Sequence, residues 1–326
     1  MAAAPLFEPV RFGILGCGRI ASNAFAPALA ATPHAVLQAA ASRDRARALA
    51  LAPVRAYEKY ADLLEDPAVE AVYVATHNGL HRDLALAALE HGKHVLCEKP
   101  LGRDAAECAE LLAAARRHDR HLVEAFMYRH HPQIALALRL VAAGTIGELK
   151  AVEAAFSFHL TRTDDVRLRH DWGGGALLDL GCYCINACRL FLGDEPLGVT
   201  ARGAFHPEHQ VDLAVHGVLE YAGGRFGVIS CGFDSGLRNH VILSGTLGVL
   251  TLPHAFLSWP FDAKVVVETD AGRTEHAVAK TDVFGLEIDD LAAAVRTGRM
   301  PLLGPDEGLK NARILAALLA AARAVQ

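Results

Sequence analysis

The sequence predicts an α/β protein of two domains, in which a parallel sheet flanked by helices precedes an open, mainly antiparallel β-sheet with few helices (α+β). Two domains are expected because 326 residues exceed what one hydrophobic core usually organises. Up to about Ala125, short apolar runs alternate with helical patterns, which is typical of βαβ units. Beyond Ala125, alternating strand patterns and glycine-rich turns dominate. We therefore expect one domain over residues 1–125 and a second over 126–326.

Five apolar runs predict the strands of the first domain: Arg11–Gly16, Val36–Ala41, Ala71–Thr76, His94–Cys97 and His121–Ala125. Between the third and fourth of these, Leu80, Leu84 and Ala88 recur at helical spacing. Gly92 follows them at the position of a left-handed C-terminal cap. This stretch therefore predicts a helix.

A helical pattern that ends near Gly144 leads into the second sheet. The strands expected there are Lys150–Phe158, Val211–Leu219, Gly227–Gly232, His240–Ser244 and Lys264–Glu268. Two helical stretches close the chain, one over Leu286–Arg296 and one from Pro305 onward. Their apolar faces are compatible with covering the second sheet or with returning to the first domain.

Composition excludes several classes of protein. Hydrophobic residues make up 52% and charged residues 21%, as in globular domains, and a net charge of -5 disfavours nucleic acid or an anionic membrane as the main partner. Met1–Pro5 lacks the features of a signal peptide, and no apolar run is long enough to span a bilayer. The cysteines form an odd, unspaced set that predicts reduced thiols and a cytoplasmic location: Cys17, Cys97, Cys108, Cys182, Cys184, Cys188 and Cys231. Three of them crowd one predicted helix but point to different faces without a nearby histidine, so no metal site is expected.

Gly16, Gly18 and Ala21 form a Gly-x-Gly-x-x-Ala pattern between a predicted strand and a predicted helix. Gly16 permits a tight turn, Gly18 lets backbone amides approach a pyrophosphate, and Ala21 allows close packing of helix on strand. Arg19 and Ile20 begin the helix and are expected to contribute to the same site. A glycine-rich turn without a ligand is the alternative. The pattern and its context predict a Rossmann domain that binds a nicotinamide dinucleotide.

Cofactor preference is expected at the end of the second strand, where NAD enzymes usually place a carboxylate. Here Ser42 leaves space, and Arg43 and Arg47 supply positive charge toward a 2′-phosphate, so we predict NADP, with NAD as second choice. Asp44 is the counter-argument, because a shift of one residue in the strand end would place its carboxylate at the tip. The arginines could alternatively form a solvated helix face.

Glu98, Lys99 and Pro100 follow a short apolar strand at its carboxyl end, the edge where ligands bind in open α/β sheets. A lysine there can hold positive charge against a substrate oxygen and can favour the anionic form of a neighbouring phenol. We expect Pro100 to fix the turn, with a cis bond before it as one option. A surface lysine that ends a strand is the alternative.

Asp179 and Tyr183 are four residues apart, so on a helix they share one face. A carboxylate and a phenol at one spot suit proton transfer and hydrogen bonding to a polyol. The preceding glycines, Gly173–Gly175, allow another backbone or a ligand to come close. An ordinary amphipathic helix that happens to carry a tyrosine is the alternative.

Together, Gly16–Ala21, Glu98–Pro100 and the Asp-x-Gly-x-Tyr segment Asp179–Tyr183 resemble the glucose-fructose oxidoreductase / inositol dehydrogenase (Gfo/Idh/MocA) family. The resemblance is greatest to the branch that holds aldose dehydrogenases and dimeric dihydrodiol dehydrogenases. It extends over most of the chain, including Tyr57–Leu64, Thr76–His81 and Glu124–Arg129.

The resemblance implies an NAD(P)-dependent enzyme that transfers hydride between nicotinamide and a carbinol or carbonyl carbon of a sugar or polyol. It implies that Lys99 is the lysine of the family's Glu-Lys-Pro motif. Tyr183 would be the general acid/base, at a position where inositol dehydrogenases carry histidine, and Asp179 would bind substrate hydroxyls. The second sheet would form dimers or tetramers, as it often does in this family.

The resemblance also implies cofactor contacts beyond the glycine turn. Asn78 and His81 would line the nicotinamide, and Thr76 and Glu98 are placed in the same cofactor set. His77 replaces the proline that is common in the family, which leaves the local turn open.

Four weaker candidates for the substrate pocket lie where the two domains are expected to meet, and each could instead be packing or surface: Arg129, Phe158, His170 and Trp172. His130 and His216 receive no role. Two alternatives keep catalysis, namely a trans-dihydrodiol dehydrogenase and a sugar-to-sugar hydride shuttle with tightly bound NADP. An alternative of another class is a catalytically silent dinucleotide-binding regulator.

Overall fold

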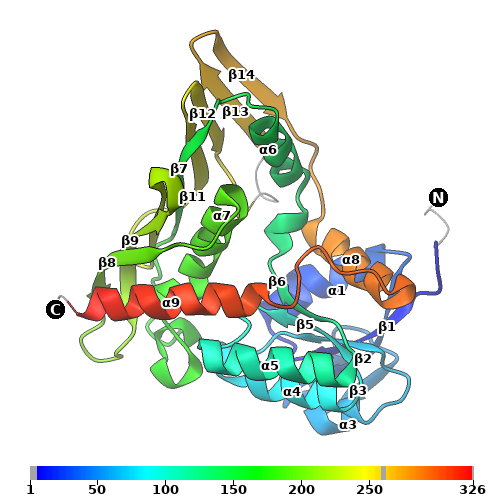
Figure 1. Ribbon diagram of the computed structural model, residues 1–326. Coiled ribbons are helices and arrows are strands. Elements are labelled where there is room, and N and C mark those ends of the chain that lie inside the picture. Colours follow the sequence, from blue (N-terminus) through cyan, green and yellow to red (C-terminus); the bar gives the residue numbers. More distant parts are fainter. Residues whose placement is uncertain (1–5, 258–261, 325–326) are drawn as a thin grey trace. The chain divides into compact units, whose positions relative to one another are not determined.

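The computed structural model describes residues 6–257 and 262–324 (Figure 1). The chain divides into two compact units, the first comprising Met1–Met127 and Asp282–Leu309 and the second Tyr128–Thr281 and Lys310–Gln326. The expected boundary after Ala125 lies close to the end of the first segment. The expectation that 126–326 form one continuous domain is wrong, because a C-terminal segment belongs to the first unit.

The first unit is built on a six-stranded sheet of order β3-β2-β1-β4-β5-β6 in which every pairing is parallel. The strands are β1 (Val10–Leu15), β2 (Ala35–Ala41), β3 (Arg55–Tyr57), β4 (Ala71–Val74), β5 (His94–Glu98) and β6 (Leu122–Ala125). The predicted parallel sheet is confirmed, with β3 added at its edge. Strand order reverses between β1 and β4, and such a switch point is where ligands bind in sheets of this kind.

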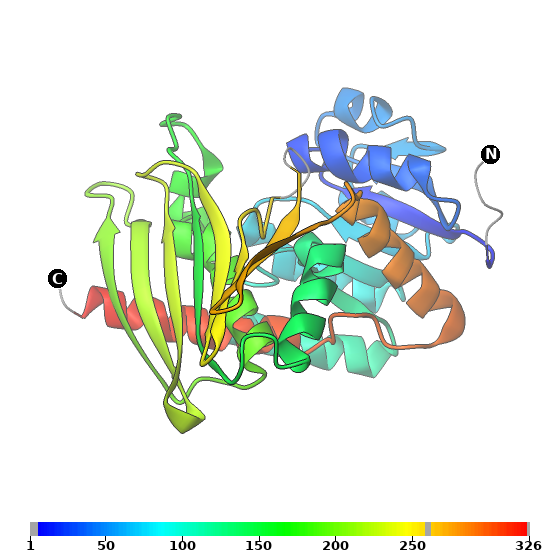
Figure 2. The same cartoon turned by 90° about the horizontal axis from the view of Figure 1, so that it is seen from above.

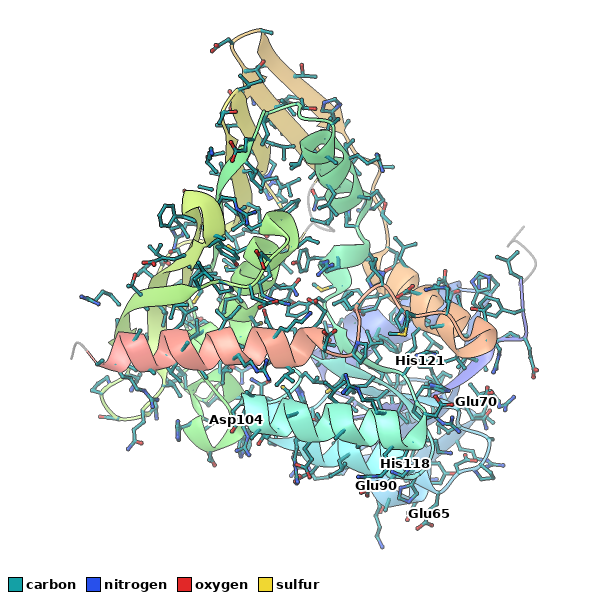
Figure 3. All side chains as sticks on the ribbon, viewed as in Figure 1. Glu65, Glu70, Glu90, Asp104, His118 and His121 are labelled. Atoms are coloured by element: carbon teal, nitrogen blue, oxygen red, sulfur yellow. The ribbon has the colours of Figure 1, made fainter. Side chains whose placement is uncertain are left out.

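Helices connect these strands. They are η1 (Ala21–Phe25) continuing into α1 (Ala26–Ala31), α2 (Arg45–Leu49), α3 (Tyr60–Leu64), η2 (Asn78–Leu80) leading into α4 (His81–Glu90), and α5 (Ala105–His118). The helix predicted before Gly92 is α4, and Gly92 adopts the expected positive φ of 71°. Asp104 begins α5 by accepting the Glu107 N–H at 2.9 Å, and Figure 3 shows Asp104 and His118 at opposite ends of this helix.

The C-terminal segment joins the first unit through α8 (Val283–Thr297). Its apolar face packs against α1 and strands β1 and β2. Asp289 accepts a hydrogen bond from Thr32, and Arg296 donates to the Glu70 carboxylate at 2.7 and 2.8 Å. Apolar burial, the Thr32–Asp289 hydrogen bond and the Arg296–Glu70 ion pair explain why the helical stretch predicted at Leu286–Arg296 returns to the first sheet.

The second unit is built on an eight-stranded sheet of order β14-β13-β12-β11-β7-β10-β9-β8. The strands are β7 (Leu149–Ser157), β8 (Gly198–Phe205), β9 (Asp212–Tyr221), β10 (Arg225–Gly232), β11 (Arg238–Gly245), β12 (Gly248–Leu252), β13 (Lys264–Thr269) and β14 (Gly272–Ala277). All neighbours are antiparallel except β7 and β10, which run parallel. The expected large, mainly antiparallel sheet is therefore present, and β8, β12 and β14 are additions to it.

One face of this sheet is covered by helices of the same unit. These are α6 (Pro132–Ala142), α7 (Cys182–Leu192) and the part of α9 (Glu307–Arg323) that follows Leu309. Glycines in the strands let the helices approach, since a Cβ on Gly227 would lie 3.1 Å from Cys188 of α7 and one on Gly217 would lie 2.7 Å from Leu318 of α9. Figure 2 shows the strands of the sheet side by side with α9 alongside.

One described helical stretch, His170–Leu192, is long and apolar enough by composition to cross a membrane, contrary to the sequence expectation. In its most apolar window 83% is buried inside the protein, as in the core helix of a globular fold. Met1–Pro5, on which the expectation about a signal peptide rests, lie outside the described residues.

Candidate active site

The glycine turn lies between β1 and a helix that begins at Arg19. Gly16 has a φ of +96°, and a Cβ there would lie 2.7 Å from the Ala75 carbonyl oxygen, so the end of the neighbouring strand requires glycine. A Cβ on Gly18 would meet nothing nearer than that oxygen at 4.0 Å. Space beside Gly18 therefore leads to the first N–H groups of the helix, which are the donors that a pyrophosphate needs. The backbone fits a dinucleotide.

The segment after β2 shows which groups the Asp44 carboxylate contacts. Its carboxylate caps α2 by accepting the Ala46 N–H at 3.0 Å, and it lies 3.4 Å from Arg47 Nε. Ser42 is buried and its hydroxyl accepts the Asp44 N–H at 3.3 Å, whereas Arg43 is exposed. The Asp44 carboxylate thus already has local partners, and the exposed charge next to Ser42 is the guanidinium of Arg43.

Tyr60, at the start of α3, belongs to the same neighbourhood and was not among the expected site residues. Burial raises the pKa of its phenol, and the positive charge of Arg43 opposes that shift. Burial likewise raises the pKa of the Cys17 thiol to about 11, opposed by the charge of Arg47. Sequence resemblance covered Tyr60 but offered no reason to select it.

The turn after β4 carries Thr76, His77 and Asn78, and Asn78 opens the short helix η2. His77 has φ -76° and ψ 155°, which is the backbone region that proline occupies. The replacement of the family's proline by His77 therefore leaves the turn in place.

His81 corrects one expectation. Its Nδ1 lies 2.8 Å from the Pro100 carbonyl oxygen and its Nε2 lies 3.2 Å from that of Thr76. Burial lowers the pKa of the ring to about 4, and the side chain has no accessible surface. A side chain without accessible surface cannot contact nicotinamide directly, so His81 joins the turns after β4 and β5 instead.

The Glu98-Lys99-Pro100 segment ends β5 at the same edge of the sheet as Gly16 and Thr76, and the Lys99–Pro100 peptide bond is cis. The Tyr73 hydroxyl donates to Glu98 Oε1 at 2.5 Å. Beyond the turn, the Leu101 N–H donates to Glu124 Oε1 at 2.9 Å. Buried partners on both sides thus hold the segment that carries Lys99.

In the second unit, Asp179 lies in a π-helical turn, Leu177–Gly181, that continues directly into α7 with Tyr183 in its first turn. Tyr183 is buried among aromatic rings. Its ring centroid lies 5.4 Å from that of Phe156, 5.5 Å from Phe256 and 5.8 Å from Tyr128. The phenol is therefore held in an apolar, aromatic setting.

The Asp179 carboxylate has a partner that sequence reasoning missed. Arg167 Nε donates to Asp179 Oδ2 at 2.6 Å across twelve residues of chain. The Arg167 carbonyl oxygen accepts the Gly175 N–H at 2.9 Å, so the glycines before the helix accommodate another backbone. The expectation that these glycines permit a close approach is thus met by the segment that carries Arg167.

Comparison with known proteins identifies the family. A family profile described as an oxidoreductase family with an NAD-binding Rossmann fold matches residues 10–126, and a GFO/IDH/MocA C-terminal domain profile matches residues 134–251. The chain belongs to the GFO/IDH/MocA family. It is an oxidoreductase, as are the relatives that follow.

Three relatives illustrate the range of this GFO/IDH/MocA branch. D-xylose 1-dehydrogenase (NADP(+)) 2 of Haloferax volcanii is 37% identical over 94% of this chain and 95% of its own length. Trans-1,2-dihydrobenzene-1,2-diol dehydrogenase of Xenopus laevis is 38% identical over 74% of this chain and 75% of its own. The crystal structure of a 3-ketoreductase from Actinomadura kijaniata, in complex with NADP and TDP-benzene, has a TM-score of 0.91 at 32% identity, covering 96% of this chain and 98% of that one.

The weaker candidates of this GFO/IDH/MocA member have different surroundings. Arg129 Nη1 donates to Asn186 Oδ1 at 3.2 Å, and the Tyr128 hydroxyl donates to the same oxygen at 2.5 Å. Asn186 lies on α7 one turn after Tyr183 and was not predicted. Phe158 lies 5.7 Å from the Arg167 guanidinium, which places it near Asp179.

His170 and Trp172 are the remaining two candidates. Arg169 stacks on Trp172 with 4.7 Å between guanidinium carbon and ring centroid, and His170 is exposed. A place for both residues in the substrate pocket stays a prediction.

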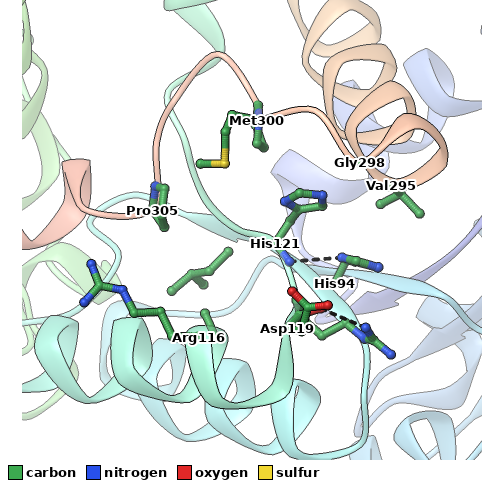
Figure 4. Close-up of a pocket in the computed structure, with 12 residues that line it drawn as sticks. His94, Arg116, Asp119, His121, Val295, Gly298, Met300 and Pro305 are labelled. Atoms are coloured by element: carbon green, nitrogen blue, oxygen red, sulfur yellow. Dashed lines mark hydrogen bonds between the residues drawn. The ribbon is translucent and has the colours of Figure 1, made fainter.

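A cavity of about 530 Å³ in the first unit lies away from this edge of the sheet (Figure 4). Its lining includes His94, which begins β5, and His121, which precedes β6. The cavity therefore lies at the amino ends of the strands, opposite to the edge that carries Gly16, Thr76 and Glu98. Ligands in open α/β sheets bind at the carboxyl ends, so this cavity is not the cofactor site.

The seven cysteines are all buried and free of disulfides in the described structure. Burial raises the pKa of Cys188 to about 12, which keeps that thiol protonated. Among the described residues, no group of three or more histidine, cysteine, aspartate or glutamate side chains is arranged to hold a metal ion.

Proposed function

We propose that the protein is an NADP-preferring oxidoreductase that transfers hydride between nicotinamide and a carbinol or carbonyl carbon of a sugar or polyol, as an aldose 1-dehydrogenase does. The observation that carries this proposal is the position of Asp179 and Tyr183 on consecutive turns of one buried helix, in a chain of this oxidoreductase family. A carboxylate that accepts hydroxyl hydrogen bonds beside a phenol that exchanges a proton suits polyol chemistry.

The proposed cofactor contacts lie at the carboxyl edge of the first sheet. Gly16, Gly18, Arg19 and Ile20 would receive the pyrophosphate at the helix N-terminus. Ser42, Arg43 and Arg47 would receive the 2′-phosphate, and the use of Asp44 as a helix cap supports NADP over NAD. Thr76, Asn78 and Glu98 would lie along the nicotinamide half. The NADP complex of the ketoreductase and the NADP-dependent xylose dehydrogenase support the same choice.

The proposed mechanism assigns separate tasks to the chain's own residues. Nicotinamide, when bound, supplies or accepts the hydride. Tyr183 exchanges the proton of the reacting hydroxyl, and the aromatic rings around it exclude water from that proton. Lys99 is proposed to stabilise negative charge on the substrate oxygen, and its charge would also favour the anionic form of a phenol bound beside it. Asp179 orients the substrate through its hydroxyls.

The test is turnover by purified protein with NADP or NAD and a panel of aldoses and polyols, followed by reduced-nicotinamide absorbance. We expect turnover of a pentose or hexose with preference for NADP. Tyr183→Phe should lower kcat/KM by about 10²- to 10⁴-fold because it removes the exchanging proton. Tyr221→Phe is the matched control, since the buried Tyr221 hydroxyl has no hydrogen-bond partner among the described residues and its removal should leave turnover unchanged.

The other outcomes separate the remaining alternatives. No turnover with either cofactor, despite tight dinucleotide binding, would indicate a catalytically silent regulator. NADP that stays bound through dialysis and is reduced by one sugar and reoxidised by another would indicate a sugar-to-sugar hydride shuttle.

A trans-dihydrodiol dehydrogenase is the second candidate, favoured by one observation. The three aromatic rings around Tyr183 would pack well against the ring of an unsaturated diol. Comparing kcat/KM for trans-1,2-dihydrobenzene-1,2-diol with that for D-xylose separates the two candidates.

We also propose a cytoplasmic location, supported by the seven reduced, buried thiols. A homodimer or tetramer through the second sheet is proposed for its outward strand positions, where Phe226 is 43% and Val228 38% exposed. Sedimentation of the wild type and of a Phe226→Lys, Val228→Lys variant tests the assembly, because two charges on that face should give monomers.

A further inference from the structure

We propose that Arg167 is a positioning residue that holds the Asp179 carboxylate in the orientation needed to accept a substrate hydroxyl. This inference rests on the proposed function, because it concerns the same substrate site. Arg167 Nε donates to Asp179 Oδ2 at 2.6 Å, a short charge-assisted hydrogen bond. An ionised carboxylate has two oxygens with about four acceptor directions, and the bond to Arg167 fixes the orientation of both oxygens.

The backbone of Arg167 is itself held in place. Its carbonyl oxygen accepts the Gly175 N–H at 2.9 Å, and a Cβ on Gly174 would lie only 2.4 Å from that oxygen. Asp165 accepts the Arg167 N–H at 3.0 Å and lies 3.2 Å from Nη1. The close approach of the Arg167 backbone therefore requires glycine at position 174. Because this backbone is held in place, the Arg167 side chain reaches Asp179 from a fixed starting position.

The surroundings of this ion pair differ from those of an ordinary surface pair. The side chains of Arg167 and Asp179 are 32% and 16% exposed. Charge on Asp179 is the first cause of the raised pKa of Arg167, and the ring of Phe158 lies 5.7 Å from the guanidinium. A partly buried pair of this kind is much less screened by solvent than an exposed one.

The same segment supplies its own comparison. Arg162 pairs with Asp164 across the same two-residue spacing that joins Arg167 to Asp165, but these side chains are 57% and 78% exposed. Arg162 has no described contact with the helix that carries Asp179 and Tyr183. It is therefore a matched control for the loss of an arginine from this segment.

The experiment measures KM and kcat for the best polyol, and the Kd of NADPH by fluorescence, in six proteins: wild type, Arg167→Met, Arg167→Lys, Asp179→Asn, Arg167→Met with Asp179→Asn, and Arg162→Met. Arg167→Met should raise the polyol KM about tenfold and change kcat less than about threefold, because it weakens binding shared by ground and transition states. The Kd of NADPH should stay unchanged, and Arg162→Met should match wild type within about twofold. Arg167→Lys keeps the positive charge and should have a polyol KM between those of wild type and Arg167→Met.

The double variant decides whether Arg167 acts through Asp179. If it does, the polyol KM of the double variant should be less than about twofold above that of Asp179→Asn alone, since the effects of residues that act as one unit are not additive. If Arg167→Met alone fails to fold because it leaves a buried charge without its partner, the double variant and Arg167→Lys still give the comparison.

Two results would overturn the proposal: additive losses in the double variant, or a polyol KM for Arg167→Met equal to that of Arg162→Met. A wild-type protein that turns over no polyol would instead refute the proposed function, and the positioning role with it. The two failures are distinguishable because the first occurs in an active enzyme.

Discussion

The carboxylate of Asp212 on β9 accepts the backbone N–H of Leu177 at 2.6 Å, across 35 residues of chain. Leu177 opens the helical run that carries Asp179 and Tyr183. Gly175, at a φ of +119°, passes so close that a Cβ there would lie 2.3 Å from Asp212 Oδ1. The helix of the candidate site thus begins at a carboxylate supplied by the sheet.

Asp212→Ala should lower the free energy of unfolding by about 1–2 kcal/mol, because the Leu177 N–H loses its acceptor in a buried place. Asp212→Asn keeps an oxygen acceptor and should lose less. The same Asp212→Asn substitution removes a carboxyl group whose pKa is raised by burial, and with it the cost of burying a charge. Urea unfolding followed by circular dichroism measures both. Equal losses in the two variants would contradict the capping role.

Arg43→Ala should raise the KM for NADP by about 10- to 100-fold and leave that for NAD nearly unchanged, since it removes a charge-assisted contact to the 2′-phosphate. Arg45→Ala, which removes another exposed arginine two residues on, is the control and should change neither KM value. Initial rates with both cofactors give the answer. A parallel rise in both KM values would show that Arg43 does not read the 2′-phosphate.

Acid should destabilise the protein through His81. Its folded pKa of about 4 lies below the ordinary value of 6.5, so the stability it contributes is present above about pH 6.5 and is lost as pH falls toward 4. For this fully buried ring the shift corresponds to about 3 kcal/mol. Over this pH window, the free energy of unfolding should fall by about that amount less in His81→Gln than in wild type. The control is His91→Gln, at an exposed histidine, which should follow wild type. His94, whose pKa burial also lowers to about 4, contributes in the same window in all three proteins.

Alkali should destabilise it through Glu287 on α8. The side chain is buried, and neither carboxyl oxygen has a hydrogen-bond partner among the described residues. Burial, with the nearby charges of Glu98 and Asp290, raises its pKa well above 4.5. A raised folded pKa means that the contribution to stability is complete below the unfolded value and is lost as pH rises through the folded one.

Glu287→Gln cannot ionise and should therefore be more stable than wild type at about pH 9 and similar to it at about pH 5. Thermal unfolding across this range measures the difference. The exposed Glu65→Gln variant is the control and should run parallel to wild type. A constant offset between Glu287→Gln and wild type at every pH would contradict ionisation as the cause.

Most strands of both sheets could be predicted, those of the first sheet from short continuous apolar runs and those of the second from alternating or β-branched residues. The strands that were not predicted are β3, β8, β12 and β14. Three of them are edge strands with mostly half-buried or exposed side chains, namely β3, β8 and β14, so they need no apolar run. The parallel pairing of β7 with β10 joins segments some 75 residues apart, as in Ala151 with Phe226, and no local pattern encodes such a partner.

The site residues divide in the same way. Gly16 and Gly18 could be selected from the sequence because a strand-to-helix turn that binds a phosphate needs glycine, and Asp179 and Tyr183 because they are spaced one helical turn apart. Their supports could not be found. Arg167 lies in a short 3₁₀ helix, Val166–Leu168, Asp212 lies on a distant strand, and Asn186 lies on a mainly apolar helix. Each acts through a contact that exists only once the chain has folded.

The sequence by itself determined the parallel sheet, the glycine turn, the two motifs that carry Lys99 and Tyr183, and the family to which they belong, because periodicity and local backbone demands are written into neighbouring residues. Only the tertiary structure decided that α8 returns to the first sheet, that His81 is a buried brace between two turns, and that Arg167 holds Asp179. Burial, ion pairing and helix capping between segments far apart in the chain depend on three-dimensional packing, which local patterns do not encode.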